Sequence, residues 1–412
     1  MSITGTAPGV EQVVRELLAS ASVERAFRFF EARAGELTEE HARICAIPAP
    51  PFGEAERALY LAEKFRERGL REVSIDREGN CVAFRRGQRE RPLLVVSAHL
   101  DTVFPEGTDF TVKRDEQGRM RAPGIADDGC GLAALVALAG AFEECGVGTA
   151  GSLLLVGTVG EEGEGNLRGA RHLLTAGEWA GRIDGFISLD GPGVERITNR
   201  ALGSRRYRVR YTGTGGHSWG DFGAANPVHA LGRAVARLTS YPAPPRPRTT
   251  FNVGRVEGGS GVNVIAREAV MDVDLRSESA EELGRLDAFF RRAAREAADD
   301  ENAARRAGTP PLELDMRLLG DRPSGVTQPN STIVRLAEEA TRAVGFRPRL
   351  DCSSTDSNVA ISMNVPAVTI GAGGASGNSH TLDEWYDPRG RDAGLKRALL
   401  LILGLVGLAE GA

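Results

Sequence analysis

Short apolar segments alternate with helical patterns along the first half of this chain, and this feature restricts its fold more than any other. The apolar segments include LLVVSAH, SLLLVGT and GFISL, and helical patterns separate them. Strands that are buried on both faces read as continuous apolar runs, and alternation with helices is typical of a largely parallel sheet. The sequence therefore predicts an α/β fold with a mainly parallel sheet and helices on both faces.

A second pattern begins near residue 200. Strand and helix patterns follow one another there in the order βαββαβ, which matches a ferredoxin-like α+β sandwich. The α/β pattern then resumes with VPAVTIG and a final apolar helix. A chain of 412 residues is also long enough for two domains. We therefore expect a main domain in two parts, residues 1–199 and 326–412, with an inserted ferredoxin-like domain at residues 200–325.

Composition excludes several classes of protein. Hydrophobic residues make up 41% and charged residues 26%, as in folded globular chains, and a net charge of -5 makes nucleic acid an unexpected partner. No apolar run reaches the ~20 residues of a membrane span, and the N-terminus lacks a signal-peptide pattern. Five cysteines without CxxC spacing favour reduced thiols, and hence a cytoplasmic location, over disulfides or a thiolate zinc site.

Side chains that commonly bind metals follow the apolar segments. In open α/β sheets, ligands bind at the carboxyl ends of the strands. His99 and Asp101 lie two residues apart, so they project to one side, and Asp101 can accept a hydrogen bond from the imidazole. Glu161 and Glu162 point in opposite directions if the segment is extended, so one can bind a metal while the other faces a water. An exposed acidic turn is the competing interpretation. Asp190 follows a third strand.

Two further segments contribute ligands of the same kinds. Asp127 and Asp128 lie in a glycine-flanked turn before a helix, where a carboxylate can bridge two cations or cap the helix. His380 follows a glycine-rich loop. Carboxylates mixed with imidazoles, without cysteine, suit catalytic zinc, manganese or cobalt better than a structural zinc site. The combination predicts a catalytic metal centre at one edge of the sheet.

The segments HLDTVF, APGIADDGCG, TVGEEGEG, SLDG and SHTLDEWY resemble the motif series of one metallopeptidase family. That family contains aminoacylase, carboxypeptidase G, peptidase T, acetylornithine deacetylase and succinyl-diaminopimelate desuccinylase, and the pattern is most similar to peptidase T. The resemblance implies two divalent cations, with zinc favoured and cobalt or manganese also suitable. It implies that Asp127 bridges them, that His99 and Asp190 complete one ion's ligands, and that Glu162 and His380 complete the other's.

The resemblance also implies a reaction and a substrate class. Water held between the cations would lose a proton to Glu161 as general base and attack an amide carbonyl, while Asp101 orients His99. The expected substrate is a short peptide, as for a tripeptide aminopeptidase. A deacylase of N-acyl amino acids is the alternative. A non-catalytic binding protein on the same scaffold is a third, less favoured reading.

The inserted domain resembles the family's lid, which commonly forms a homodimer. His217 resembles the lid histidine that reaches a neighbouring active site and polarises the scissile carbonyl, although a turn histidine with a local hydrogen bond is the alternative. Asn263 and Arg276 match lid positions that hold substrate, and the guanidinium of Arg276 suits a carboxylate. Three residues of a further loop are expected to contact substrate: Thr355, Asp356 and Asn358.

Gly129 departs from the pattern of the family that the chain resembles. Many relatives have a lysine at this position, and the departure leaves the metal ligands intact. His41, His172 and His229 lie in helical patterns, where packed or solvated histidines are the expected interpretation.

Overall fold

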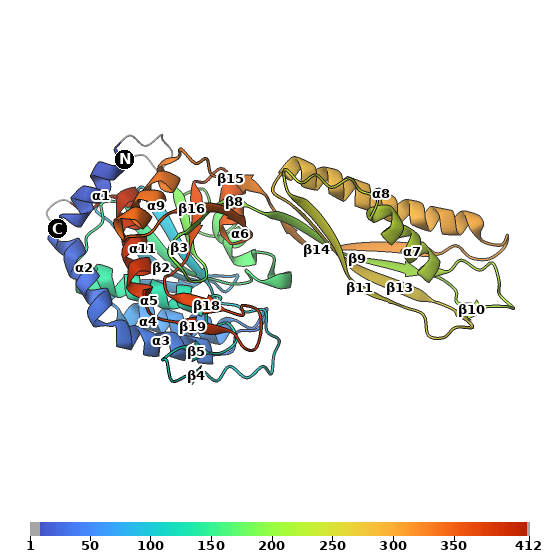
Figure 1. Ribbon diagram of the computed structural model, residues 1–412, viewed down its shortest axis with the longest axis horizontal. Coiled ribbons are helices and arrows are strands. Elements are labelled where there is room, and N and C mark those ends of the chain that lie inside the picture. Colours follow the sequence, from blue (N-terminus) through green and yellow to red (C-terminus); the bar gives the residue numbers. More distant parts are fainter. Residues whose placement is uncertain (1–8, 410–412) are drawn as a thin grey trace. The chain divides into compact units, whose positions relative to one another are not determined.

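The computed structural model describes residues 9–409, and the chain forms two compact units (Figure 1). Unit 1 contains the chain up to Ala201 and from Val326 onward, and unit 2 is Leu202–Gly325. Each unit has a hydrophobic core of its own, so each is described separately.

Unit 1 is built on a nine-stranded sheet in the order β1-β2-β6-β3-β7-β17-β8-β15, with β16 beside β8. Its strands are β1 (Glu72–Ile75), β2 (Cys81–Arg85), β3 (Leu93–His99), β6 (Ser152–Thr158), β7 (Gly185–Leu189), β8 (Arg196–Ala201), β15 (Gly325–Val326), β16 (Arg349–Ser353) and β17 (Ala367–Ile370). The pairs β3–β6, β3–β7, β7–β17 and β8–β16 are parallel. Antiparallel pairs are β1–β2, β2–β6 and β8–β17. The predicted mainly parallel sheet is confirmed.

Helices cover both faces of this sheet (Figure 1). One face packs against α4 (Ala55–Glu67), α5 (Gly129–Glu144), α9 (Thr332–Ala343) and α11 (Arg391–Val406). The helices α1 (Val10–Leu18), α2 (Ala21–Ala32) and α3 (Ala34–Ala46) pack on these helices and join the same core. The other packs against α6 (Arg168–Thr175) and α10 (Ser357–Ser362). Along β3, Leu94, Val96 and Ala98 join the first core, and Leu93 and Val95 join the second. Burial on both faces therefore explains the continuous apolar run.

A small sheet that the sequence did not predict also lies in unit 1, in the order β18-β19-β5-β4. Its strands are β4 (Lys113–Arg114), β5 (Met120–Arg121), β18 (Ala375–Gly377) and β19 (Trp385–Asp387). Trp385 of β19 pairs with Arg121 of β5. This pairing brings the segment after His380 beside the segment that leads to Asp127.

Unit 2 is the predicted ferredoxin-like sandwich. Its main elements are β9 (Gly203–Thr212), α7 (Pro227–Leu238), β11 (Thr249–Gly258), β13 (Glu268–Ser277), α8 (Ala280–Ala304) and β14 (Glu313–Arg322). The four strands form an antiparallel sheet in the order β11-β13-β9-β14, and both helices pack on one face. Two short strands, β10 (Gly216–His217) and β12 (Val264–Ile265), form a separate pair.

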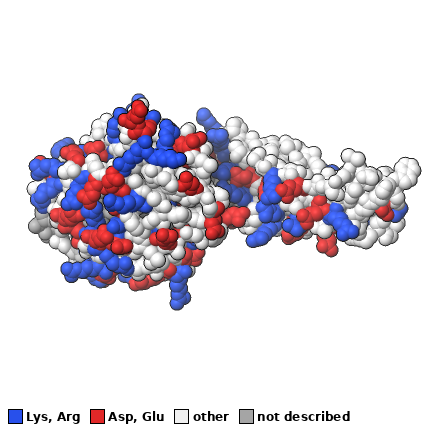
Figure 2. Space-filling model, turned by 90° about the horizontal axis from the view of Figure 1, so that it is seen from below, with Lys and Arg blue, Asp and Glu red and all other residues white. Residues whose placement is uncertain are grey.

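Acidic and basic side chains are interspersed on the face of each unit that Figure 2 shows. On the sheet of unit 2, cross-strand ion pairs join Arg208 to Asp272 at 2.8 Å and Arg210 to Glu268 at 2.9 Å. Within residues 9–409, none of the helices combines the length and the apolar character that crossing a membrane requires.

Candidate metal centre

Three of the five predicted ligands lie at or just after neighbouring strand ends of unit 1. His99 is the last residue of β3, Asp190 directly follows β7, and Glu162 comes four residues after the end of β6. The three strands are adjacent and parallel in the order β6-β3-β7, so their carboxyl ends share one edge of the sheet. Asp127 lies in the turn before α5, and His380 lies in the loop between β18 and β19.

Four of these side chains are in direct contact. Nε2 of His99 is 2.8 Å from Oδ1 of Asp127, and Nε2 of His380 is 3.1 Å from Oδ2 of the same carboxylate. Nε2 of His380 is also 3.0 Å from Oε1 of Glu162. The two oxygens of Asp127 thus face two different imidazoles, as a carboxylate that bridges two cations must. This donor set, nitrogen and oxygen without sulfur, fits a catalytic metal site.

The predicted ligands alter one another's pKa values. Burial opposes ionisation of Asp127, but hydrogen bonds from His380 and His99 outweigh it and lower the pKa of its carboxyl. The same carboxylate and that of Glu162 raise the pKa of His380 to about 10. Burial and the charge of Asp127 raise the pKa of Asp190 to about 7. Among the described contacts, the Asp190 carboxylate makes no hydrogen bond to the other four ligands, so its role as a ligand stays a prediction.

These pKa values predict that metal affinity rises with pH. His380 holds a proton on Nε2 up to a pKa of about 10, and a cation must displace that proton to bind the same nitrogen. Each displaced proton should change the apparent affinity about tenfold per pH unit below that pKa. Calorimetric titration with zinc in two buffers of different ionisation enthalpy measures the protons released. The variant His172→Ala should keep the dependence, and equal affinity at pH 6.5 and 8.5 would contradict the prediction.

Asp101 does not make the hydrogen bond that we expected. Nδ1 of His99 is 2.9 Å from the backbone carbonyl of Asp101, whereas the carboxylate lies 3.7 Å away. That carboxylate instead accepts hydrogen bonds from the backbone N–H groups of Glu161 at 3.0 Å and Glu162 at 2.7 Å. Because the carbonyl occupies Nδ1, Nε2 of His99 is the nitrogen that faces Asp127 and could bind a metal. The buried carboxylate of Asp101 positions the glutamate pair.

The two aspartates of the turn divide the two predicted roles between them. The carboxylate of Asp128 accepts hydrogen bonds from Gly131 N–H at 3.1 Å, His99 N–H at 3.1 Å and Gly191 N–H at 3.2 Å. Asp128 therefore caps α5 and ties it to the ends of β3 and β7. Asp127 faces the histidines.

Glu384 is a site residue that the sequence interpretation missed. Its fully buried carboxylate accepts hydrogen bonds from Ala126 N–H at 2.7 Å, Asp127 N–H at 2.9 Å and Gly124 N–H at 3.3 Å. It therefore holds the turn that presents Asp127. The available signal was its place in SHTLDEWY, four residues after His380.

The three residues expected to contact substrate have hydrogen-bond partners within unit 1. Thr355, Asp356 and Asn358 are all buried. The Oγ1 of Thr355 is 2.6 Å from the hydroxyl of Thr369, and Oδ1 of Asn358 accepts from Thr355 N–H at 3.0 Å. The hydroxyl of Thr158, at the end of β6, donates to Asp356 at 2.5 Å. Asp356 therefore supports the β6 end and Thr355 bonds β17, while a contact of these three residues with substrate stays a prediction.

The remaining predicted residues belong to unit 2. His217 is in β10 and Asn263 is adjacent to its partner strand, where the carbonyl of Asn263 accepts from Ser218 N–H at 2.9 Å. Arg276 lies on β13, and its Nε donates to Asp274 at 2.6 Å. The structure thus brings His217 and Asn263 together, and it gives Arg276 an acidic neighbour.

An α/β unit with imidazoles and carboxylates gathered at the carboxyl edge of its sheet, interrupted by a ferredoxin-like insertion, fits the class of metal-dependent enzymes. Comparison with known proteins narrows this class. The sequence model of peptidase family M20/M25/M40 matches residues 95–404, which is most of the chain. The chain belongs to this family, it is an enzyme, and the predicted resemblance is confirmed.

Individual relatives agree with this assignment. The chain is 27% identical over 328 residues to succinyl-diaminopimelate desuccinylase of Leptothrix cholodnii, covering 75% of this chain and 81% of the relative. Its fold is similar to aminopeptidase PepT of Bacillus cereus, with a TM-score of 0.72, 20% identity, and coverage of 90% and 98% of the two chains. It is also similar to Bacillus subtilis YxeP, described as a dinuclear metal binding peptidase, with a TM-score of 0.67, 17% identity, and coverage of 92% and 100%.

Proposed function

We propose that this enzyme is a two-metal peptidase that cleaves short peptides. Unit 1 would be the catalytic domain and would bind two divalent cations, with zinc favoured and cobalt or manganese also suitable. The observation that carries this proposal is the position of Asp127, whose two oxygens face His99 and His380. The proposed ligands are His99, Asp127, Glu162, Asp190 and His380.

The proposed reaction is general-base hydrolysis. The cations, when bound, supply polarisation of the amide carbonyl and a lowered pKa for the attacking water. Glu161 takes the proton from that water and returns it to the departing amine. Its placement supports this role, since Asp101 anchors the backbone N–H groups of both glutamates while the side chain of Glu162 turns toward His380. Glu161 itself is buried, which suits a proton acceptor that is shielded from bulk water.

For unit 2 we propose the role of a lid that dimerises and supplies His217 as a carbonyl donor. Nδ1 of His217 accepts hydrogen bonds from Trp219 N–H at 3.2 Å and Gly220 N–H at 3.3 Å. An accepting Nδ1 in a neutral imidazole requires the proton on Nε2. The turn therefore presents Nε2–H as a donor, which is what an oxyanion contact needs.

Exposed apolar side chains around His217 support the homodimer. Trp219 is 88% exposed, Phe222 is 79% exposed, and Val262 is fully exposed. Apolar groups grouped in this way are typical of interaction surfaces, and a second copy of this chain would cover them. Asn263, beside His217, and Arg276 remain the proposed substrate contacts of the lid.

The proposed location is the cytoplasm. All five cysteines are free thiols, and reduced cysteines are the normal state in that compartment.

Two substrate classes fit the proposed centre. Short peptides are favoured because the fold is most similar, by TM-score, to an aminopeptidase among the comparisons given above. Deacylation of N-acyl amino acids is the second candidate, supported by 27% identity to a desuccinylase. Both reactions cleave an amide bond with the same groups.

A substrate panel tests this choice. Zinc-loaded protein should release amine from tripeptides with kcat/KM at least about tenfold above that for dipeptides, N-acetyl amino acids and N-succinyl amino acids. Protein treated with a chelator is the control and should be inactive on every member. Preference for an N-acyl amino acid would establish the deacylase instead. Binding without turnover of any member would leave the third possibility, a non-catalytic binding protein.

A further inference from the structure

A buried histidine outside the ligand set contacts the turn that presents Asp127. His41, on α3, is fully buried, and its Nε2 lies 2.6 Å from the backbone carbonyl of Ile125. Ile125 is also fully buried and lies two residues before Asp127. A change at this carbonyl therefore acts directly on the backbone that carries the central carboxylate.

Arg391 determines which nitrogen of His41 carries the proton. Nη2 of Arg391 is 2.8 Å from Nδ1 of His41. A guanidinium can only donate, so Nδ1 must accept, and the proton of the neutral ring must be on Nε2. Burial and the charge of Arg391 both lower the pKa of His41, which keeps the ring neutral. His41 consequently donates to the carbonyl of Ile125.

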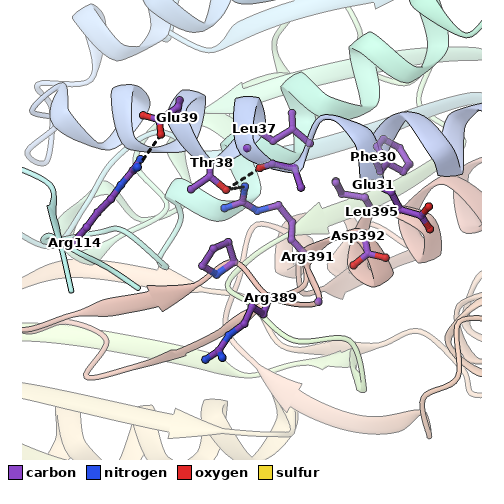
Figure 3. A pocket seen from close by; sticks show the side chains of 14 residues that line it. Phe30, Glu31, Leu37, Thr38, Glu39, Arg114, Arg389, Arg391, Asp392 and Leu395 are labelled. Atoms are coloured by element: carbon purple, nitrogen blue, oxygen red, sulfur yellow. Dashed lines mark hydrogen bonds and ion pairs between the residues drawn. The ribbon is translucent and has the colours of Figure 1, made fainter. Parts of the chain in front are cut away.

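Neutral partners hold Arg391 in place. Its Nη1 donates to the hydroxyl of Thr38 at 3.2 Å, as Figure 3 shows, and its Nε donates to the hydroxyl of Tyr386 at 3.2 Å. The ring of Tyr386 packs edge-on against His41, with centroids 4.8 Å apart. Thr38 and Arg391 lie on the wall of a cavity of about 640 Å³, where Arg114 and Glu39 pair with each other (Figure 3). The series of contacts thus runs from this cavity to the metal-binding turn.

Within the described part of the chain, two thiols also bond carbonyls of this turn, and they are weaker donors. The thiol of Cys130 lies 3.0 Å from the carbonyl of Ala126, and the thiol of Cys45 lies 3.8 Å from that of Gly124. Thiols donate weakly compared with an imidazole N–H. His41 therefore supplies the strong side-chain donor on the carbonyl side of the turn, opposite the N–H groups that Glu384 holds.

The absence of a side chain at Gly129 leaves space for the side chains of Cys45 and His41. A Cβ atom at position 129 would lie 2.1 Å from Sγ of Cys45 and 3.1 Å from Nε2 of His41. Any side chain at position 129 would therefore crowd both Cys45 and His41, so the glycine is part of the arrangement that lets His41 approach the turn.

We propose that His41, oriented by Arg391, is a positioning residue for the metal centre and fixes the backbone of Ile125 so that Asp127 can bridge two cations. The proposal rests on the proposed role of Asp127 but not on any substrate. Removal of the donor should let the turn shift and weaken metal binding. Partners that orient metal ligands typically contribute 10–100-fold in affinity, so about tenfold is expected here.

The test measures zinc affinity by competition with a chelator, together with the visible absorption spectrum of the cobalt-loaded protein. His41→Phe should bind zinc about tenfold more weakly and change the cobalt spectrum, whereas His41→Gln, which keeps an N–H at the position of Nε2, should recover most of the affinity. His172→Phe, a histidine of unit 1 outside these contacts, is the matched control and should bind as the wild type does. A merely structural role would lower the unfolding temperature and leave affinity and spectrum unchanged.

Two further measurements decide the outcome if His41→Phe does not fold. Nitrogen NMR of wild-type protein, which contains six histidines, should place the ring proton of His41 on Nε2. Arg391→Met should weaken zinc binding several-fold, because Nδ1 loses its donor and the ring can change tautomer. A proton on Nδ1 in the wild type, or wild-type zinc affinity in folded His41→Phe or Arg391→Met, would overturn this proposal alone. A wild-type protein without affinity for zinc would overturn the proposed function as well.

Discussion

Replacement of Glu161 by Gln is expected to lower kcat by about 10²–10⁴-fold while the protein keeps its metal. The substitution removes the proton acceptor and preserves the size of the side chain. The backbone N–H of residue 161 would still donate to Asp101, so the neighbouring Glu162 should stay turned toward His380. Steady-state kinetics and elemental analysis on the same preparation measure both effects.

The matched variant Glu162→Gln should behave in the opposite way. It replaces a carboxylate oxygen that lies 3.0 Å from His380 Nε2 with a weaker ligand, so metal content should fall first and activity with it. Added zinc should restore part of the activity of Glu162→Gln and none of that of Glu161→Gln. Equal loss of metal in both variants would show that our division of roles between the two glutamates is wrong.

The second large effect concerns His217 of unit 2. His217→Ala should lower kcat by about 10²–10³-fold, because it removes a donor to the developing oxyanion. If the donor acts across a dimer, two inactive variants should complement each other. A mixed dimer of His217→Ala and Glu161→Gln contains one site with both functional residues, and it should show up to about half of the activity of a wild-type dimer.

Subunit exchange must be demonstrated for this experiment, for example by mass spectrometry of differently tagged chains. A mixture of Glu161→Gln with the double variant Glu161→Gln/His217→Ala is the control, since none of its sites contains the general base. Proven exchange without recovered activity would rule out a shared site. Full activity of His217→Ala alone would remove the histidine from the mechanism.

Regular elements of this fold could be predicted where their residues repeat with a period. The run LLVVSAH predicts β3 because both of its faces are buried, and the order of patterns predicts the ferredoxin-like unit. The strands β4, β5, β18 and β19 could not be found in the same way, since each has only two or three residues. Such strands are too short to show alternation, and their pairing alone defines them.

Residue chemistry at strand ends likewise predicted the candidate ligands. His99 and Glu162 were selected because they follow apolar strands, Asp127 because it lies in a glycine-flanked turn, and His380 because it follows a glycine-rich loop. In the structure, His99 and His380 both contact Asp127, and His380 also contacts Glu162. His41 was expected to be a packed or a solvated histidine, because it lies in a helical pattern. Its bond to Ile125 joins residues 84 positions apart, and no local pattern reports such a contact.

The sequence by itself determined the class of fold, the kinds of ligand and the approximate place of each along the chain, because burial and strand ends leave local signals. Only the tertiary structure decided which partner each polar group takes. It assigned Asp128 to the helix cap, and it turned the carboxylate of Asp101 toward Glu161 and Glu162. The physical reason is that a hydrogen bond requires heavy atoms within about 3 Å, and the path of the loops sets that separation.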